Sequence, residues 1–148
     1  MILLLDEQLD SPDMRVARAL DIIGASHDLS FRSLRTEAAG LKDPEIPAYC
    51  EREGIDALVS FNVRDWGAKD ALYRALIEAG VSIIVLRPQA KKSLTVEQQL
   101  SVLSKHLRVI GGHLHEGGNV LVRVNESGCR KWTLEELRKE IAREGRLP

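Results

Sequence analysis

The amino-acid sequence predicts an α/β protein: a single-domain three-layer α/β/α fold with a mainly parallel central sheet. Two observations lead to this prediction. Short aliphatic runs alternate along the chain with longer segments whose apolar residues recur at helical spacing, and such alternation is typical of parallel sheets. The runs are also continuous rather than alternately polar, as expected of strands that helices cover on both faces. The 148 residues, 44% of them hydrophobic, suffice for one domain with its own core.

The N-terminal half of the chain is expected to hold three strands and two helices. The helices are recognised by their ends. Ser11-Pro12 and Asp43-Pro44 each place a capping residue before a proline at the first helical position, and Gly24 and Gly54 stand where a helix usually stops. The expected elements are, in order, a strand at 2–5, a helix at 11–24, a strand at 25–31, a loop or weak helical turn at 33–42, a helix at 43–53 and a strand at 55–61.

The C-terminal half continues the alternation. The β-branched run at 81–86 is the clearest strand signal in the sequence, and Thr133 with Glu136 forms a capping box at the start of the last helix. The expected elements are a helix at 68–79, a strand at 81–86, a helix at 95–110, a glycine-rich loop at 111–118 with His113 and His115, a strand at 119–124, a segment at 128–132 that extends this strand or pairs with it as a hairpin, and a helix at 133–144. Residues 1–124 are expected to form the core of the domain, to which the hairpin and helix of 125–148 are added.

Charge is distributed unevenly, although the net charge is only −1. Residues 1–65 contain 13 acidic against 7 basic side chains, a net charge of −6, and residues 66–148 contain 9 against 14, a net charge of +5. This division suits a protein with a cation site in one half and a polyanion-binding surface in the other. An ordinary mixed surface, on which the two halves balance, is an equally good interpretation.

The two cysteines, Cys50 and Cys129, lie far apart in the sequence and form no zinc or disulfide pattern. Cys50 falls inside an expected helix, so a buried free thiol is predicted there. The N-terminus lacks the basic region of a signal peptide, and no apolar run approaches the roughly 20 residues that span a bilayer. We therefore expect a cytoplasmic protein without membrane contact.

Acidic side chains recur at the ends of expected strands and at a helix start. Carboxyl ends of parallel strands meet at one edge of a sheet, where α/β proteins bind ligands. Oxygen ligands there would suit Mg²⁺ or Mn²⁺. The simpler alternatives are that Asp6 and Glu7 solvate the end of the first strand and that Asp43 is an ordinary N-cap. The groups are Asp6 with Glu7 after the first strand, Asp43 with Glu45 at a helix start, and Asn62 with Asp65 after the third strand.

Basic residues provide weaker candidates. Arg87 directly follows the fourth strand and could hold a phosphate with two parallel hydrogen bonds or form a surface ion pair. The pairs Lys91-Lys92 and Arg130-Lys131 could contact an RNA backbone or form part of a solvated face.

Four segments in this order, ILLLDE, KDPEIPAYCEREG, IDALVSFNVRDW and VSIIVLRP, resemble the PIN-like domains of the VapC-type toxin group, and more closely the compact PIN-like subgroup of that group. The resemblance covers roughly residues 1–123. It implies a Mg²⁺- or Mn²⁺-dependent ribonuclease in which several acids gather at the carboxyl edge of the sheet. By position, Asp6 matches the first-strand acid and Asp43 the helix-borne acid, Asn62 stands at the next acidic position, and Asp65 with Trp66 approximates an Asp-Phe pair. The sequence departs from the pattern because Asn62 is neutral and Asp65 comes one residue late.

The resemblance thus leads us to expect an endoribonuclease that hydrolyses RNA phosphodiesters, in the role of the toxin of a toxin–antitoxin pair. The alternative is a PIN-like module that has lost activity and binds nucleic acid or protein; an unrelated nucleotide-binding or receiver domain is a weaker third interpretation, since no glycine-rich phosphate loop follows the first strand. Expected partners are RNA, an antitoxin protein and a second copy of the chain. The expected metal ligands are Asp6, Asp43 and Asp65, with Asn62 as a further catalytic residue and Glu7, Glu45 and Arg87 in supporting positions.

Overall fold

The computed structural model describes residues 1–6, 15–60, 66–87, 95–117 and 119–143. Its strands are β1 (Ile2–Leu5), β2 (Ser30–Ser33), β3 (Ala57–Ser60), β4 (Ser82–Leu86), β5 (Leu121–Val124) and β6 (Cys129–Trp132). Its α-helices are α1 (Arg15–Gly24), α2 (Leu34–Glu37), α3 (Ile46–Glu53), α4 (Trp66–Glu78), α5 (Val96–His115) and α6 (Leu134–Arg143), and two short 3-10 helices are η2 (Ala25–His27) and η3 (Asp43–Glu45).

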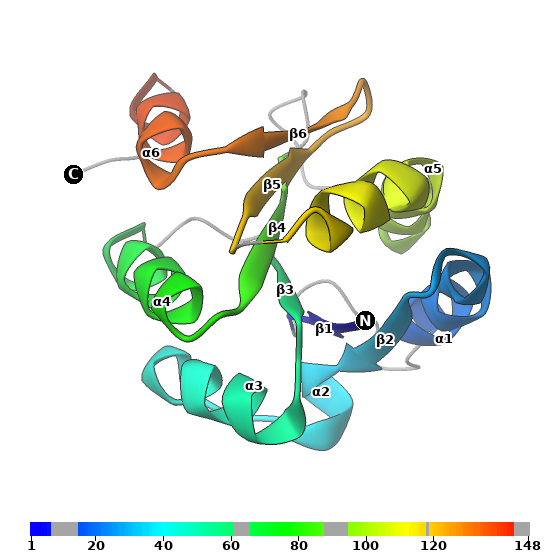
Figure 1. Cartoon of the computed structure of the whole chain (residues 1–148), viewed down its shortest axis with the longest axis horizontal. Helices are drawn as coiled ribbons and strands as arrows, with labels where there is room; N and C mark the ends of the chain where they lie inside the picture. The colour runs from blue at the N-terminus through cyan, green and yellow to red at the C-terminus, as the bar shows by residue number, and fades with distance from the viewer. Residues whose placement is uncertain (7–14, 61–65, 88–94, 118, 144–148) are drawn as a thin grey trace.

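Within the described residues, the strands form one six-stranded sheet in the order β2-β1-β3-β4-β5-β6. The first five strands in this order run parallel to one another, and β6 runs antiparallel to β5. Helices α1 and α5 cover one face, and α3, α4 and α6 cover the other (Figure 1). The predicted three-layer α/β/α fold with a mainly parallel sheet is therefore confirmed, and the segment after β5 forms the hairpin alternative.

Each face of the sheet has its own hydrophobic core, because side chains alternate along a strand. Leu3 and Leu5 of β1 pack under α1 and α5, whereas Leu4 packs under α3 and α4. The same alternation on β4 sends Ile83 and Val85 to the second core. Strands buried on both faces explain the continuous aliphatic runs in the sequence.

The expected strand at 25–31 is wrong in its first half. Residues Ala25–His27 form η2, and the strand begins only at Ser30. Asp28 adopts the left-handed conformation with φ 57°, which an Asp tolerates better than most residues. The Leu29 N–H then bonds to the carbonyl of Gly24 at 2.9 Å. This turn joins α1 to β2 and takes up the first residues of the expected strand.

The expected loop at 111–118 is also wrong, because α5 continues through both glycines to His115. The buried stripe of Leu103, Leu107 and Ile110 extends to Leu114, one turn further on. The free energy gained by burying Leu114 in a helix exceeds the cost of placing two glycines in that helix. His113 and His115 are consequently helix residues two positions apart, which places them on different sides of α5.

No helix among the described residues combines the length and the apolar character that a membrane crossing requires.

Candidate functional site

The carboxyl edge of the sheet is formed where β1, β3 and β4 end, and the ladder of backbone hydrogen bonds continues one residue past two of these strands. The Asp6 N–H donates to Val59 at 3.0 Å, and the Arg87 N–H donates to Val124 at 2.8 Å. Asp6 stands two residues after Leu4, and Arg87 two residues after Val85, so both side chains point to the face that carries α3, α4 and α6.

Asp43 reaches the same place from η3, which packs against α4. The N-cap of η3 is Lys42 rather than Asp43, so the capping interpretation of Asp43 is wrong. Glu45 makes the capping contact instead, because its Oε1 accepts the backbone N–H of Lys42 at 3.1 Å. The Asp43 carboxylate is thereby directed toward α4, and the exposed Glu45 serves the start of the helix.

A lysine of α4 lies between the two carboxylates. Nζ of Lys69 is 3.2 Å from Oδ2 of Asp43 and 4.0 Å from Oδ2 of Asp6, and it also donates to Oδ1 of Asp43 at 3.4 Å. The Lys69 side chain is only 11% exposed. Two acids from distant parts of the sequence thus share one cation at the edge of a parallel sheet.

The residues beneath this ion pair are buried and hydrogen-bonded. The Tyr73 hydroxyl donates to Oγ of Ser60 at 2.8 Å, and both residues are fully buried. Burial raises the pKa of Tyr73 well above its ordinary value, and the negative charges of Asp6 and Asp43 act in the same direction. The phenol therefore stays neutral at physiological pH and provides a buried polar group near the two carboxylates.

Arg87 occupies the next position along the edge and is 6% exposed. Its Nε lies 3.2 Å from Oε2 of Glu140 on α6. The ion-pair interpretation is thus confirmed, although the arginine is buried rather than on the surface. The pair holds the Arg87 guanidinium on the same face of the sheet as Lys69, where its charge acts to lower the pKa of Tyr73.

Sequence reasoning missed Lys69, although a signal for it exists. Lys69 shares one face of α4 with Leu72, Tyr73 and Leu76, all buried. Lysine is rarely buried without a partner. A lysine at helical spacing from buried residues, on the helix that follows a group of acids, therefore indicates an ion pair with one of those acids. Of the other predicted residues, Glu7, Asn62 and Asp65 lie outside the described part of the chain.

The carboxylates of Asp6 and Asp43 are the kind of ligand that a hard divalent cation prefers, but they are only two. Asp6 and Asp43 supply carboxylate oxygens that already converge on one positive charge, and such oxygens are the ligands that Mg²⁺ and Mn²⁺ prefer. Within the described ranges, no group of three or more His, Cys, Asp or Glu side chains could hold a metal ion. A complete site would therefore need ligands from outside those ranges, where Asn62 and Asp65 lie.

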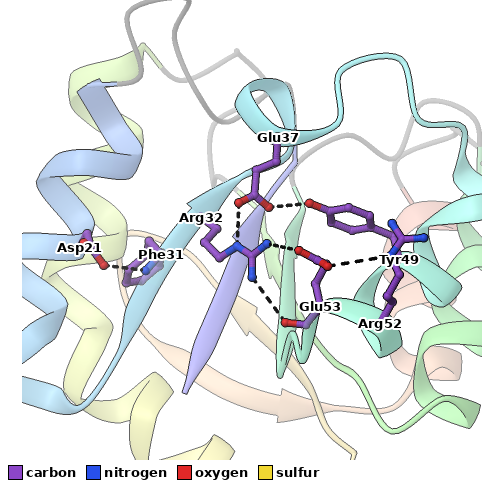
Figure 2. Close-up of polar contacts among 7 residues, drawn as sticks. All are labelled: Asp21, Phe31, Arg32, Glu37, Tyr49, Arg52 and Glu53. Carbon is purple, nitrogen blue, oxygen red and sulfur yellow. Dashed lines mark hydrogen bonds and ion pairs between the residues drawn. The ribbon is translucent and has the colours of Figure 1, made fainter.

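A second polar cluster, which Figure 2 shows, ties α2 and α3 to β2. Arg32 pairs with Glu37 at 2.6 Å and with Glu53 at 2.7 Å, and the Tyr49 hydroxyl donates to Glu37 at 2.6 Å. Arg52 stacks over the Tyr49 ring at 5.4 Å. The acids here are neutralised internally. The cluster fixes α3 against the sheet and so helps to position η3, which carries Asp43.

The chain matches no protein-family model, and comparisons with curated proteins and with solved structures found no match.

Proposed function

We propose that this protein is a PIN-like endoribonuclease that depends on Mg²⁺ or Mn²⁺ and hydrolyses RNA phosphodiesters. The observation that supports the proposal best is the convergence of Asp6 and Asp43 on a single cation at the carboxyl edge of a parallel sheet. Lys69 supplies that cation in the protein alone. The position suits a metal ion because the two carboxylates are already oriented toward one point between them.

In this proposal Asp6 and Asp43 hold the ion, together with Asp65 and with Asn62 as a neutral oxygen ligand. When bound, the ion polarises a phosphoryl oxygen and lowers the pKa of the attacking water. Lys69 moves from the carboxylates to the substrate, where its ammonium neutralises a phosphate oxygen. Arg87, whose counter-ion is Glu140, stands on the same face beside the reacting phosphate. Tyr73 stays protonated, because its pKa is raised by burial, so it releases no proton to the reaction.

The test combines metal binding with RNA cleavage. Calorimetric titration with Mn²⁺ and cleavage of a labelled RNA are measured for the wild type, Asp6→Asn and Asp43→Asn. Asp28→Asn is the matched control, because Asp28 is an exposed acid whose left-handed backbone Asn also adopts. Both site variants should lose Mn²⁺ affinity and cleavage by at least about tenfold, and the control should keep both. Equal Mn²⁺ binding by the wild type and Asp6→Asn contradicts the proposal.

A second candidate function is a non-catalytic PIN-like module that binds nucleic acid or protein. The observation that favours it is that the Lys69 ammonium already pairs with both carboxylates, while Asn62 is neutral. The variant Asn62→Asp separates the two functions. Cleavage by the wild type with Mn²⁺ supports the enzyme, and failure of both the wild type and Asn62→Asp to cleave supports the binding module.

A further inference from the structure

A row of side chains crosses the sheet from the candidate site to β6. Ser60 pairs with Val85, Val85 with Arg123, and Arg123 with Arg130. Asp6 stands beside Ser60 in the same row, since Leu5 pairs with Val59. Neighbouring strands are about 4.8 Å apart, so the row extends roughly 19 Å from the acid on β1 to the arginine on β6.

The two arginines of this row lie on the same face of the sheet as the candidate site. Leu121 and Trp132, which pair across the hairpin, belong to the core beneath α3, α4 and α6. Val122 belongs to the opposite core. Side chains alternate along a strand, so Arg123 returns to the face of Leu121, and its cross-strand partner Arg130 lies on that face too. Arg87 lies on this face too, two residues beyond Val85 on β4.

Arg123 is a charged group without a charged partner in the described part of the chain. Its guanidinium lies 4.6 Å from the centre of the Trp132 ring, which holds it in place by a cation–π contact. Its Nε is buried and finds no hydrogen-bond acceptor among the described residues. A buried donor without an acceptor destabilises the fold, and an anion that accepts from the guanidinium offsets this cost.

The pairing of Arg123 with Arg130 is unfavourable in the isolated protein. Like charges directly opposite each other on antiparallel strands destabilise a sheet, and Arg130 is exposed, with no acid placed across the strand to balance it. Both arginines belong to the basic half of the sequence. Two arginines paired across a hairpin on one face of the sheet indicate a negatively charged ligand that contacts both.

We propose that Arg123 and Arg130, with Trp132 supporting the first, bind the phosphodiester backbone of single-stranded RNA and guide it past Arg87 to the Asp6–Asp43 site. The inference rests on the proposed function and names the surface that holds its substrate. Planar guanidinium groups match the geometry of phosphate oxygens.

The test measures the binding of a short fluorescein-labelled oligouridylate by fluorescence anisotropy in EDTA, so that no cleavage occurs. The double variant Arg123→Gln/Arg130→Gln is compared with the wild type over a range of KCl concentrations. We expect its dissociation constant to rise by at least about tenfold and the slope of log affinity against log salt to become shallower by about 1.4, since each phosphate contact with a single strand contributes about 0.7.

The matched control is Arg18→Gln/Arg108→Gln, which removes two exposed arginines of α1 and α5 on the other side of the sheet. It should bind like the wild type. The single variant Arg130→Gln keeps the test decisive if Arg123→Gln alters the circular dichroism spectrum, because Arg130 is exposed. For Arg130→Gln, the salt slope should change by about half as much as it does for the double variant.

The inference is overturned if the double variant binds as tightly as the wild type, if the control loses as much affinity, or if the wild type binds no RNA. Cleavage with Mn²⁺ is scored separately. Arginine-dependent binding without any cleavage supports the RNA-binding surface and contradicts the proposed hydrolysis. Cleavage that survives the double variant, with unchanged binding, supports the hydrolysis and contradicts this surface.

Discussion

Nζ of Lys69 lies 3.2 Å from Oδ2 of Asp43, and this contact joins α4 to η3 at the carboxyl edge of the sheet. It gives the acids of the candidate site a counter-ion before any ligand arrives. Two carboxylates that face each other without a cation would repel, so the ammonium of α4 permits them to sit close together. A metal ion at this position must compete with Lys69, and the competition can be measured.

Replacing the lysine should make the stability of the protein depend on metal. In Lys69→Met, Asp6 and Asp43 lose their shared cation, and we expect the free energy of unfolding to fall by about 2 kcal/mol in EDTA. Millimolar Mn²⁺ should restore most of this loss and should stabilise the variant more than the wild type. Urea unfolding with and without Mn²⁺ measures both effects.

Lys139→Met provides the control for that experiment, because Lys139 is an exposed lysine of α6. Its stability should be close to that of the wild type in both conditions. An equal response of the wild type and Lys69→Met to Mn²⁺ would show that the ion does not bind where Lys69 lies.

The cluster around Arg32 makes a pH-dependent contribution to stability. Burial alone would raise the pKa of Glu37, but the hydrogen bonds from Arg32 and Tyr49 lower it below its ordinary value of 4.5. A carboxyl group whose pKa is lowered by folding stabilises the fold above its ordinary pKa, and this contribution is lost as the pH falls through the folded value. We expect Glu37→Gln to lose about 1 kcal/mol at pH 7 and the difference from the wild type to shrink below pH 4.5.

Glu78→Gln is the comparison variant for the pH dependence, since Glu78 is an exposed acid on α4. Urea unfolding of both variants at pH 7 and in acid separates the cluster from a general charge effect. A constant difference between Glu37→Gln and the wild type at all pH values would contradict the assigned pKa direction.

The buried thiol of Cys50 should be unreactive in the folded protein. Cys50 is fully buried on α3, and burial raises its pKa to about 11, so roughly 0.1% of the thiol is ionised at pH 8. A disulfide reagent at pH 8 should modify Cys50 only as fast as the protein unfolds, and within seconds in strong urea. The variant Cys129→Ala isolates the signal of Cys50. Rapid modification of this variant without urea would contradict the burial.

The sequence predicted the parallel sheet and the positions of Asp6 and Asp43, because these depend on local signals: an aliphatic run that ends in an acid, and a proline at a helix start. It missed Lys69, since the meeting of α4 with η3 depends on how distant segments pack. The pairing of Arg123 with Arg130 was missed for the same reason. Arg130 was a candidate for contact with RNA, but its partner Arg123 becomes visible only when the register of β5 and β6 is known.

Two glycines of helices that pack near each other should respond to substitution in opposite directions. A Cβ on Gly24 would lie 2.7 Å from the carbonyl oxygen of Leu29 and 3.0 Å from the Phe31 ring, although its φ of −68° suits any residue. We therefore expect Gly24→Ala to cost about 1–3 kcal/mol through overpacking. Gly112 lies inside α5 with open space around it, so Gly112→Ala should gain up to about 1 kcal/mol. Urea unfolding of the two variants tests both, and a loss of stability in Gly112→Ala would argue that residues 111–115 form the loop that their glycines suggested.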